Sequence, residues 1–318
     1  MGPWQIILII VGALLGSGLL FSIWLTFAIA WNVYHRTLTR GKHTPWGRNE
    51  PSDPNNEELW AMWNAGLMWA EKEQNYKKEV EIANDNLKLK GEFFDFGFDK
   101  TVIIIPGRRE CLIYSYYYAM PYKTANCNVL VIDQRAHGDS EGTYAGCGML
   151  ESLDVIKWMQ LLHDEYHQKS IYVHAICVGT CCASIIEGKR EHPDYLKGFI
   201  LDSTFITYKD IYKKHYIECG HKLFPVYYQV WFWFRWYTKV KINECQPIKY
   251  MPKFKTPVIF IWGKKDIYCV EKQSKQIFES CSSLDKSVVW FEDATHSHIR
   301  LNDSEKYDKS VIDFINSH

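Results

Sequence analysis

The chain has 318 residues, with 37 basic and 37 acidic side chains, so its formal net charge is zero. Hydrophobic residues make up 47% and aromatic residues 15%, which is enough apolar material for a core and excludes a wholly disordered chain. The neutral balance argues against a nucleic-acid-binding protein, because such proteins normally carry an excess of basic residues.

The N-terminal segment predicts a membrane anchor. Residues 1–34 carry no charged side chain, and residues 6–30 are almost entirely apolar. About 20 such residues span a bilayer as a helix, and Trp4 and Trp31 bracket the segment where indole rings prefer the headgroup layer. We therefore expect a single transmembrane helix at residues 1–34. A buried core helix would be shorter. A cleaved signal peptide, ending near Ala30, would have a basic start and a shorter apolar stretch.

The charges that flank this segment predict its orientation. No Lys or Arg precedes it, whereas Arg36, Arg40, Lys42 and Arg48 follow it. The positive-inside rule places that flank, and with it the body of the protein, in the cytoplasm. The ten cysteines show no spacing typical of a disulfide framework, in agreement with a reducing compartment.

Two short regions precede the main domain. Residues 35–77 are predicted as a polar linker followed by an amphipathic helix, because apolar residues recur at three- and four-residue spacing between Asn55 and Tyr76. Residues 78–98 alternate apolar and polar residues around Asn84-Asp85-Asn86, which predicts a β-hairpin.

From Thr101 onward, short apolar strands alternate with helices. Continuous apolar strands separated by helices indicate a mostly parallel sheet with helices on both faces, so the predicted fold class is α/β. We expect one such domain over residues 78–318. The expected strands are 102–105, 129–132, 171–176, 199–201, 258–262 and 288–291, and the expected helices lie near 150–165, after 179, and near 270–281 and 304–315.

A long insertion interrupts this alternation at about residues 204–251. Its centre, residues 224–237, is strongly aromatic, and insertions of this length in a wound sheet tend to be functional. Three interpretations remain open: a helical cap that covers the active site with apolar surface, a helix packed on the body, and a patch that contacts the bilayer.

The segment Ile171–Thr180 contains the candidate nucleophile. An apolar strand leads into a tight turn with Ala175 two residues before Cys177 and Gly179 two residues after it, and a helix follows. This is the context of a nucleophile elbow, which requires small residues on both sides, and a helix N-terminus stabilises a thiolate. Two alternatives are a buried, inert Cys177 and a shifted frame with Cys181 as the nucleophile.

A thiolate nucleophile needs a base, and the base needs an orienting acid. Asp266 follows the expected strand 258–262, and His296 follows the strand 288–291, so both lie at carboxyl ends of strands, where sites form in such sheets. We predict Asp266 as the acid and His296 as the base. Asp202 is the rival acid and His298 the rival base.

Two backbone N–H groups are needed to stabilise an oxyanion. Val178 follows the nucleophile and supplies one; Arg108, in the loop after strand 102–105, supplies the other. The paired side chains of Arg108 and Arg109 either contact an anionic substrate group or form surface salt bridges.

These residues carry a resemblance to the α/β-hydrolase superfamily over residues 98–316, with the hairpin at 78–98 as its first two strands. The stretch Asp133–Gly142 resembles the loop after that family's fourth strand, and the elbow, Asp266 and His296 follow in the family's order. The layout is similar to that of membrane-anchored serine-aminopeptidase-like or acylglycerol-lipase-like members. Cys177 resembles the dienelactone hydrolase branch, in which Cys, Asp and His form the triad. Two departures are Pro106-Gly107 in place of His-Gly and Ala175 in place of Gly.

The resemblance implies a membrane-anchored hydrolase that cleaves an ester, thioester or lactone of an apolar, lipid-like small-molecule acyl substrate through Cys177, His296 and Asp266. The alternatives are a catalytically inactive binding protein with the same fold and a serine-aminopeptidase-like peptidase. We expect no cofactor and no metal, because His163 and His167 lack the glutamate and the third ligand of a zinc protease.

Overall fold

The computed structural model describes residues 2–41 and 46–318, so Lys42 of the basic flank lies outside the described residues. Within them, eight strands form one sheet in the order β1-β2-β4-β3-β5-β6-β7-β8. The strands are β1 (Lys77–Asn84), β2 (Leu87–Phe94), β3 (Lys100–Ile105), β4 (Asn128–Ile132), β5 (Ser170–Ile176), β6 (Leu196–Asp202), β7 (Val258–Gly263) and β8 (Lys286–Phe291).

The sheet is antiparallel only at its start. β1 pairs with β2, and β2 with β4, in antiparallel register, and β3 to β8 pair in parallel. The predicted hairpin turn falls on Asp85 and Asn86, whose φ angles of 51° and 61° suit the tight two-residue turn of a β-hairpin. The strand order and the parallel register define the α/β-hydrolase fold, as the sequence predicts.

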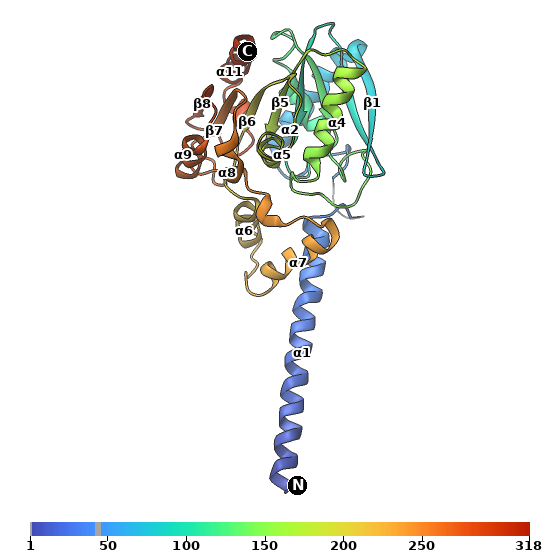
Figure 1. Ribbon diagram of the computed structural model, residues 1–318, viewed down its shortest axis with the longest axis vertical. Helices are drawn as coiled ribbons and strands as arrows, with labels where there is room; N and C mark the ends of the chain where they lie inside the picture. The colour runs from blue at the N-terminus through green and yellow to red at the C-terminus, as the bar shows by residue number, and fades with distance from the viewer. Residues whose placement is uncertain (1, 42–45) are drawn as a thin grey trace.

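Helices cover the sheet and connect its parallel strands, as the alternation of apolar segments predicts (Figure 1). Those outside the insertion are α2 (Glu57–Lys72), α3 (Leu112–Ala119), α4 (Glu151–Asp164), α5 (Val178–Lys189), α9 (Glu271–Ser280), α10 (Ile299–Asn302) and α11 (Ser304–Ser317), and a 3-10 turn, η1 (Gln74–Tyr76), follows α2. α2 begins at the cap Asn56, whose side chain accepts hydrogen bonds from two backbone N–H groups.

Sequence patterning does not reveal α3. Its sequence, LIYSYYYA, is buried at nearly every position, with only Ile113 partly exposed. A helix that is buried all round has no polar face, so the periodicity that identifies a surface helix is absent. α3 packs against α2 and against the sheet.

The N-terminal helix α1 (Pro3–Thr37) is 35 residues long and extends away from the sheet domain (Figure 1). Its most apolar stretch has a mean hydropathy of 2.6, and none of that stretch is buried. By length and composition, α1 is therefore able to cross a membrane. The helix continues three residues beyond the predicted end of the anchor at residue 34.

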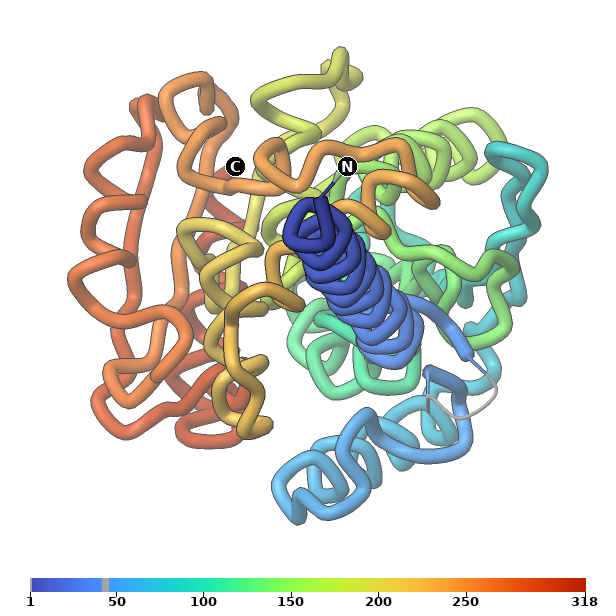
Figure 2. The backbone as a smooth tube through the Cα atoms, turned by 90° about the horizontal axis from the view of Figure 1, so that it is seen from below, coloured from blue at the N-terminus to red at the C-terminus, as the bar shows by residue number. Residues whose placement is uncertain are grey.

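The insertion between β6 and β7 is helical. It contains α6 (Tyr208–Glu218), α7 (Val226–Thr238), η2 (Ile242–Glu244), α8 (Pro247–Tyr250) and η3 (Met251–Lys253). α6 and α7 lie on the side of the sheet domain from which α1 leaves, and the view from below in Figure 2 shows the insertion beside α1.

Candidate active site

Cys177 lies in a sharp turn between β5 and α5. Its φ of 49° and ψ of −114° are a strained conformation for a residue with a side chain. The turn leaves no space for a side chain at position 179, because a Cβ on Gly179 would lie 2.6 Å from the carbonyl oxygen of Ile105. Gly107 packs close by, and a Cβ on it would be in van der Waals contact with Cβ of Cys177 at 3.4 Å. The strain and this close packing are the features of a nucleophile elbow.

The structure brings the three predicted triad residues together. His296, in the loop after β8, has its Nε2 3.1 Å from Sγ of Cys177 and its Nδ1 2.7 Å from Oδ2 of Asp266. Asp266 lies in the loop after β7. His296 is 119 positions from Cys177 and 30 positions from Asp266 in the chain, and the three side chains form one continuous hydrogen-bonded relay.

The relay polarises His296. Burial alone would lower the pKa of His296, but the charges of Cys177 and Asp266 outweigh it and hold that pKa well above its usual value. Burial alone would raise the pKa of Asp266, but the charge and hydrogen bond of His296 keep it below its usual value. The N–H groups of Tyr268 and Cys269 also donate to Oδ1 of Asp266, at 2.7 and 2.8 Å. The carboxylate is thus held ionised beside the imidazole.

The rival residues have other partners. Asp202 accepts a hydrogen bond from the hydroxyl of Tyr307 at 2.7 Å, and burial raises the pKa of Asp202 to about 6. Nδ1 of His298 is 2.6 Å from a carboxylate oxygen of Glu58 in α2. Cys181 is fully buried inside α5. Among the described residues, none of these three side chains forms a hydrogen bond with the relay.

Cys269 is a neighbour of the relay that sequence reasoning does not find. Its Sγ lies 3.7 Å from Nδ1 of His296 and 3.2 Å from the carbonyl oxygen of Ser203. Asp266, Cys269 and His296 place their donor atoms within 4.8 Å of one another, as metal ligands do. A metal ion there would have to replace the hydrogen bond between Asp266 and His296, so the same atoms cannot serve both purposes at once.

The two predicted oxyanion donors, Val178 and Arg108, border the same cavity as Cys177. Val178 is the first residue of α5, where a backbone N–H has no acceptor within the helix. Arg108 follows Gly107, which lies against Cys177. We call the loop after β3, residues 106–111, the oxyanion loop. Two residues of the loop after β4 hold it in place: Asp133 accepts a hydrogen bond from the N–H of Leu112 at 2.7 Å, and Gln134 donates to the carbonyl oxygen of Pro106 at 2.9 Å.

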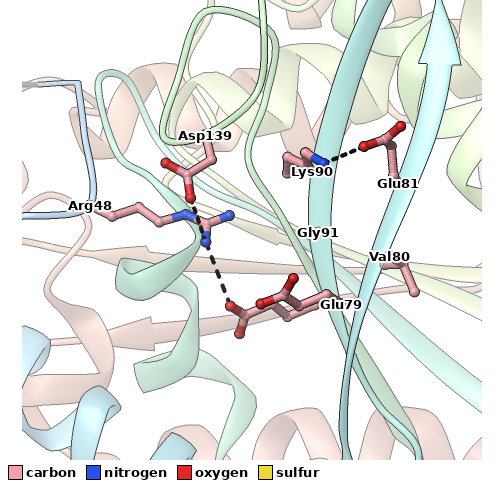
Figure 3. Close-up of a pocket in the computed structure, with 8 residues that line it drawn as sticks. Arg48, Glu79, Val80, Glu81, Lys90, Gly91 and Asp139 are labelled. Carbon is pink, nitrogen blue, oxygen red and sulfur yellow. Dashed lines mark hydrogen bonds and ion pairs between the residues drawn. The ribbon is translucent and has the colours of Figure 1, made fainter.

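Residues of the predicted linker contact the loop after β4, residues 133–142. Arg48 contacts Asp133 at 2.7 Å and Asp139 at 3.0 Å, and it borders a polar pocket of about 290 Å³ beside β1 and β2 (Figure 3). Trp46 stacks on His137 with 4.6 Å between the ring centroids. The loop 133–142 is therefore a structural support of the oxyanion loop, and residues after α1 hold it in place.

A cavity of about 500 Å³ opens at the relay. It is bordered by the oxyanion loop, the elbow, the His296 loop, the start of α2 and one face of α6. Among the described residues, none of its lining residues comes from the aromatic helix α7. The insertion therefore contributes Ile211 and His215 of α6, and Cys219 directly after it, to the wall.

Arg108 and Arg109 form no salt bridge with a described residue, so the surface ion-pair interpretation is not supported. Nη2 of Arg109 lies 3.2 and 3.3 Å from the carbonyl oxygens of Arg36 and Thr37, at the C-terminal end of α1. Burial and the charge of Arg108 lower the pKa of Arg109 to about 10, so it stays protonated at neutral pH. A cation suits the negative end of a helix dipole, and this contact joins the active-site loop to α1.

Comparisons with known proteins agree with this fold. No known family profile matches the chain. Over 195 residues, 61% of this chain and 59% of the relative, it is 25% identical to the Bem46 protein of Schizosaccharomyces pombe. Over 249 residues, 76% of this chain and 79% of the relative, it is 22% identical to the uncharacterized membrane protein YNL320W of Saccharomyces cerevisiae.

A solved structure gives the same result. The esterase Pf2001 of Pyrococcus furiosus superposes with a TM-score of 0.61 at 25% identity, covering 78% of this chain and 95% of the esterase. The chain is thus an esterase-like protein of the α/β-hydrolase fold, related to Bem46, with a long apolar N-terminal helix. The matched segment spans less than two thirds of Bem46.

Proposed function

We propose that the protein is a membrane-anchored hydrolase that cleaves esters, thioesters or lactones of apolar acyl groups with Cys177 as nucleophile. The single observation that carries the proposal is the relay from Asp266 through His296 to Cys177, with contacts of 2.7 and 3.1 Å. The relay borders a cavity of about 500 Å³, which falls in the size range of small-molecule sites. The esterase likeness supports hydrolysis.

The chemistry follows from the positions of the atoms. Nε2 of His296 holds the proton of the Cys177 thiol, so Sγ attacks the acyl carbon as a thiolate, and the carbonyl π electrons move onto oxygen. The N–H groups of Val178 and Arg108 stabilise the oxyanion. The intermediate then expels the alcohol or thiol leaving group, which takes the proton from His296. Water, deprotonated by His296, hydrolyses the acyl-cysteine in the same way and releases the acid.

Asp266 has a positioning role in this scheme. It accepts the Nδ1 proton of His296, so that Nε2 faces the nucleophile, and its charge favours the imidazolium that forms at each proton transfer. Its own carboxylate is held by two backbone N–H groups.

The anchor is supported by α1, which is able to cross a membrane by length and composition. Arg36, Arg40 and Arg48 follow it, so the positive-inside rule places the hydrolase domain in the cytoplasm. Protease protection of the full chain in sealed microsomes tests this orientation. Protection of the hydrolase domain from added protease would contradict it.

Activity is tested with the full chain in detergent, using p-nitrophenyl esters and acyl thioesters of increasing chain length. We expect turnover by the wild type and by the control Cys281→Ala, whose cysteine lies outside the cavity lining, and none by Cys177→Ala. Mass spectrometry after rapid acid quenching should find the acyl group on Cys177.

Other outcomes contradict the proposal. Equal turnover by the wild type and Cys177→Ala would assign the nucleophile elsewhere. Absence of turnover and of an acyl adduct in the wild type across the panel would favour the alternative, a binding protein that keeps the fold without the reaction.

A further inference from the structure

α7 has two different faces. Its buried face carries Tyr227, Val230, Trp231 and Phe234, and the rings of Tyr227 and Trp231 pack on Tyr212 of α6. Its other face exposes large aromatic residues at four-residue spacing, which places them in one row along the helix: Tyr228 at 60% exposure, Phe232 at 49% and Trp236 at 58%. We call this row, together with Phe224 at 83% exposure just before the helix, the aromatic stripe.

α7 runs alongside the upper part of α1, as Figure 1 shows. Gln229 donates to the hydroxyl of Thr26 at 2.9 Å, and Trp233 donates to the carbonyl oxygen of Phe27 at 3.0 Å. Further along both helices, Trp31 donates to the hydroxyl of Tyr237 at 3.0 Å. The contacts advance together in both helices, so α7 runs parallel to α1.

The length of α1 sets the level at which α7 lies. Its 35 residues correspond to a helix of about 52 Å, whereas the hydrocarbon core of a bilayer, about 30 Å thick, needs about 20 residues. Residues 3–25 of α1 are exposed on every side, and partial burial begins at Thr26. The residues that contact α7 therefore lie near the end of the membrane-spanning length, at the level of the headgroups.

The chemistry of the stripe suits that level. Tyr and Trp rings, which have an apolar body and a polar edge, prefer the membrane interface, and lysines near them reach toward the headgroups. Tyr228 and Trp236 are such residues, and Phe224 and Phe232 add apolar surface beside them. Exposed Lys222 precedes the stripe. Lys239 follows it, with its Nζ 5.3 Å from the ring centroid of Trp236. An apolar groove of about 780 Å³ between Leu19 and Ile23 of α1 and Tyr228 continues the surface from one helix to the other.

The stripe is connected to the wall of the active-site cavity. The hydroxyl of Tyr227, on the buried face of α7, donates to the carbonyl oxygen of Lys209 in α6 at 3.0 Å. Trp231 packs edge-on against Tyr212 of α6, with 5.0 Å between the ring centroids. The face of α6 that includes His215 borders the cavity. α7 thus has its aromatic stripe on one face and, on the other, contacts with α6, the helix that borders the cavity.

We propose that the aromatic stripe is a lipid-binding surface that lies in the headgroup layer beside α1 and holds the cavity-lining helix α6 against the bilayer. The occupant is a phospholipid bilayer, because the stripe is continuous with a helix able to cross one. A consequence, which rests on the proposed hydrolase function, is that acyl substrates reach Cys177 from the membrane and not from the aqueous phase.

Photo-crosslinking of the full chain in phosphatidylcholine and phosphatidylserine vesicles tests the surface without requiring catalysis. The crosslinker p-benzoylphenylalanine replaces Tyr228 or Phe232, with Leu14 of α1 as the lipid-exposed control and fully exposed Leu284, between α9 and β8, as the control outside α1 and the insertion. We expect lipid adducts at 228 and 232 at yields close to that of position 14 and far above that of position 284. Yields no higher than at 284, or adducts to a second copy of the chain or to another protein, would overturn the proposal.

A kinetic comparison tests the substrate route. The double substitution Phe232→Ser and Trp236→Ser should lower the ratio of kcat/KM for a vesicle-embedded ester to that for a short soluble ester by about fivefold or more. An unchanged ratio would refute the route. If no ester is turned over by the wild type, the hydrolase function fails, but the crosslinking result still decides whether the stripe binds lipid.

Discussion

Glu110 lies in the oxyanion loop, where it borders the cavity and is only 6% exposed. Its Oε1 accepts a hydrogen bond from Ser52, whereas its Oε2 is buried without a partner among the described residues. Burial raises the pKa of Glu110 from 4.5 to about 7, although the Ser52 bond opposes this. Replacing this carboxyl by an amide of the same shape, Glu110→Gln, removes the ionisation and leaves an acceptor for Ser52.

The expected magnitude follows from the two pKa values. One pKa unit corresponds to about 1.4 kcal/mol, so the difference between 4.5 and about 7 corresponds to about 3 kcal/mol of folding free energy. The folded chain binds this proton more tightly than the unfolded chain. The stabilisation is therefore fully present below pH 4.5 and is lost as the pH rises through about 7. Above that pH, the wild type must keep a charge in a buried site.

The assay is the unfolding of the full chain in detergent across this pH range, for the wild type, Glu110→Gln and the exposed control Glu50→Gln. We expect the stability of Glu110→Gln relative to the wild type to increase with pH by about 3 kcal/mol, and that of Glu50→Gln to stay constant. Parallel pH profiles for the wild type and Glu110→Gln would refute the reasoning, because they would show that Glu110 ionises normally in the folded protein.

Four further substitutions test the site. Asp266→Asn should lower kcat about 10⁴-fold, because it removes the charge that orients the imidazole. Asp202→Asn should retain far more activity. If steady-state assays show the larger loss for Asp202→Asn, Asp202 and not Asp266 is the acid of the triad. Gly179→Ala should destabilise the fold by about 1–3 kcal/mol in thermal melts, since its Cβ would lie 2.6 Å from the carbonyl oxygen of Ile105. An unchanged Tm would mean that the turn at Cys177 has room for this Cβ, contrary to the distance in the structure. His298→Gln breaks the contact with Glu58 and should leave kcat within about twofold; loss of activity would make His298 the base.

Local patterns in the chain were sufficient for much of the fold and for the candidate triad. Each buried strand of a parallel sheet is a short apolar run, so its position can be recognised without knowing its neighbours. The elbow at Cys177 is visible because a tight turn tolerates only small residues on both sides, and Asp266 and His296 directly follow recognisable strands. The chain alone also gives the length and apolar character of α1.

Only the tertiary structure decided which neighbours these residues have. Asp202 ends β6 and Asp266 lies in the loop after β7, so the preference for Asp266 over Asp202 could be tested only by the contacts of each side chain. The pairing of β7 with β8 brings the Asp266 loop beside His296, and Asp202 turns to Tyr307 instead. Burial depends on contacts between distant segments, so neither the almost wholly buried α3 nor the buried carboxyl of Glu110 could be foreseen.

The same reason explains the aromatic insertion. Its composition identifies an apolar helix but not what each face touches, because helical periodicity needs a polar face to mark the outside. Packing alone separates the face of α7 that contacts α6 from the face that lies exposed beside α1. The sequence therefore determined the strands, the elbow and the apolar helix, and the three-dimensional arrangement determined the partners of each of them.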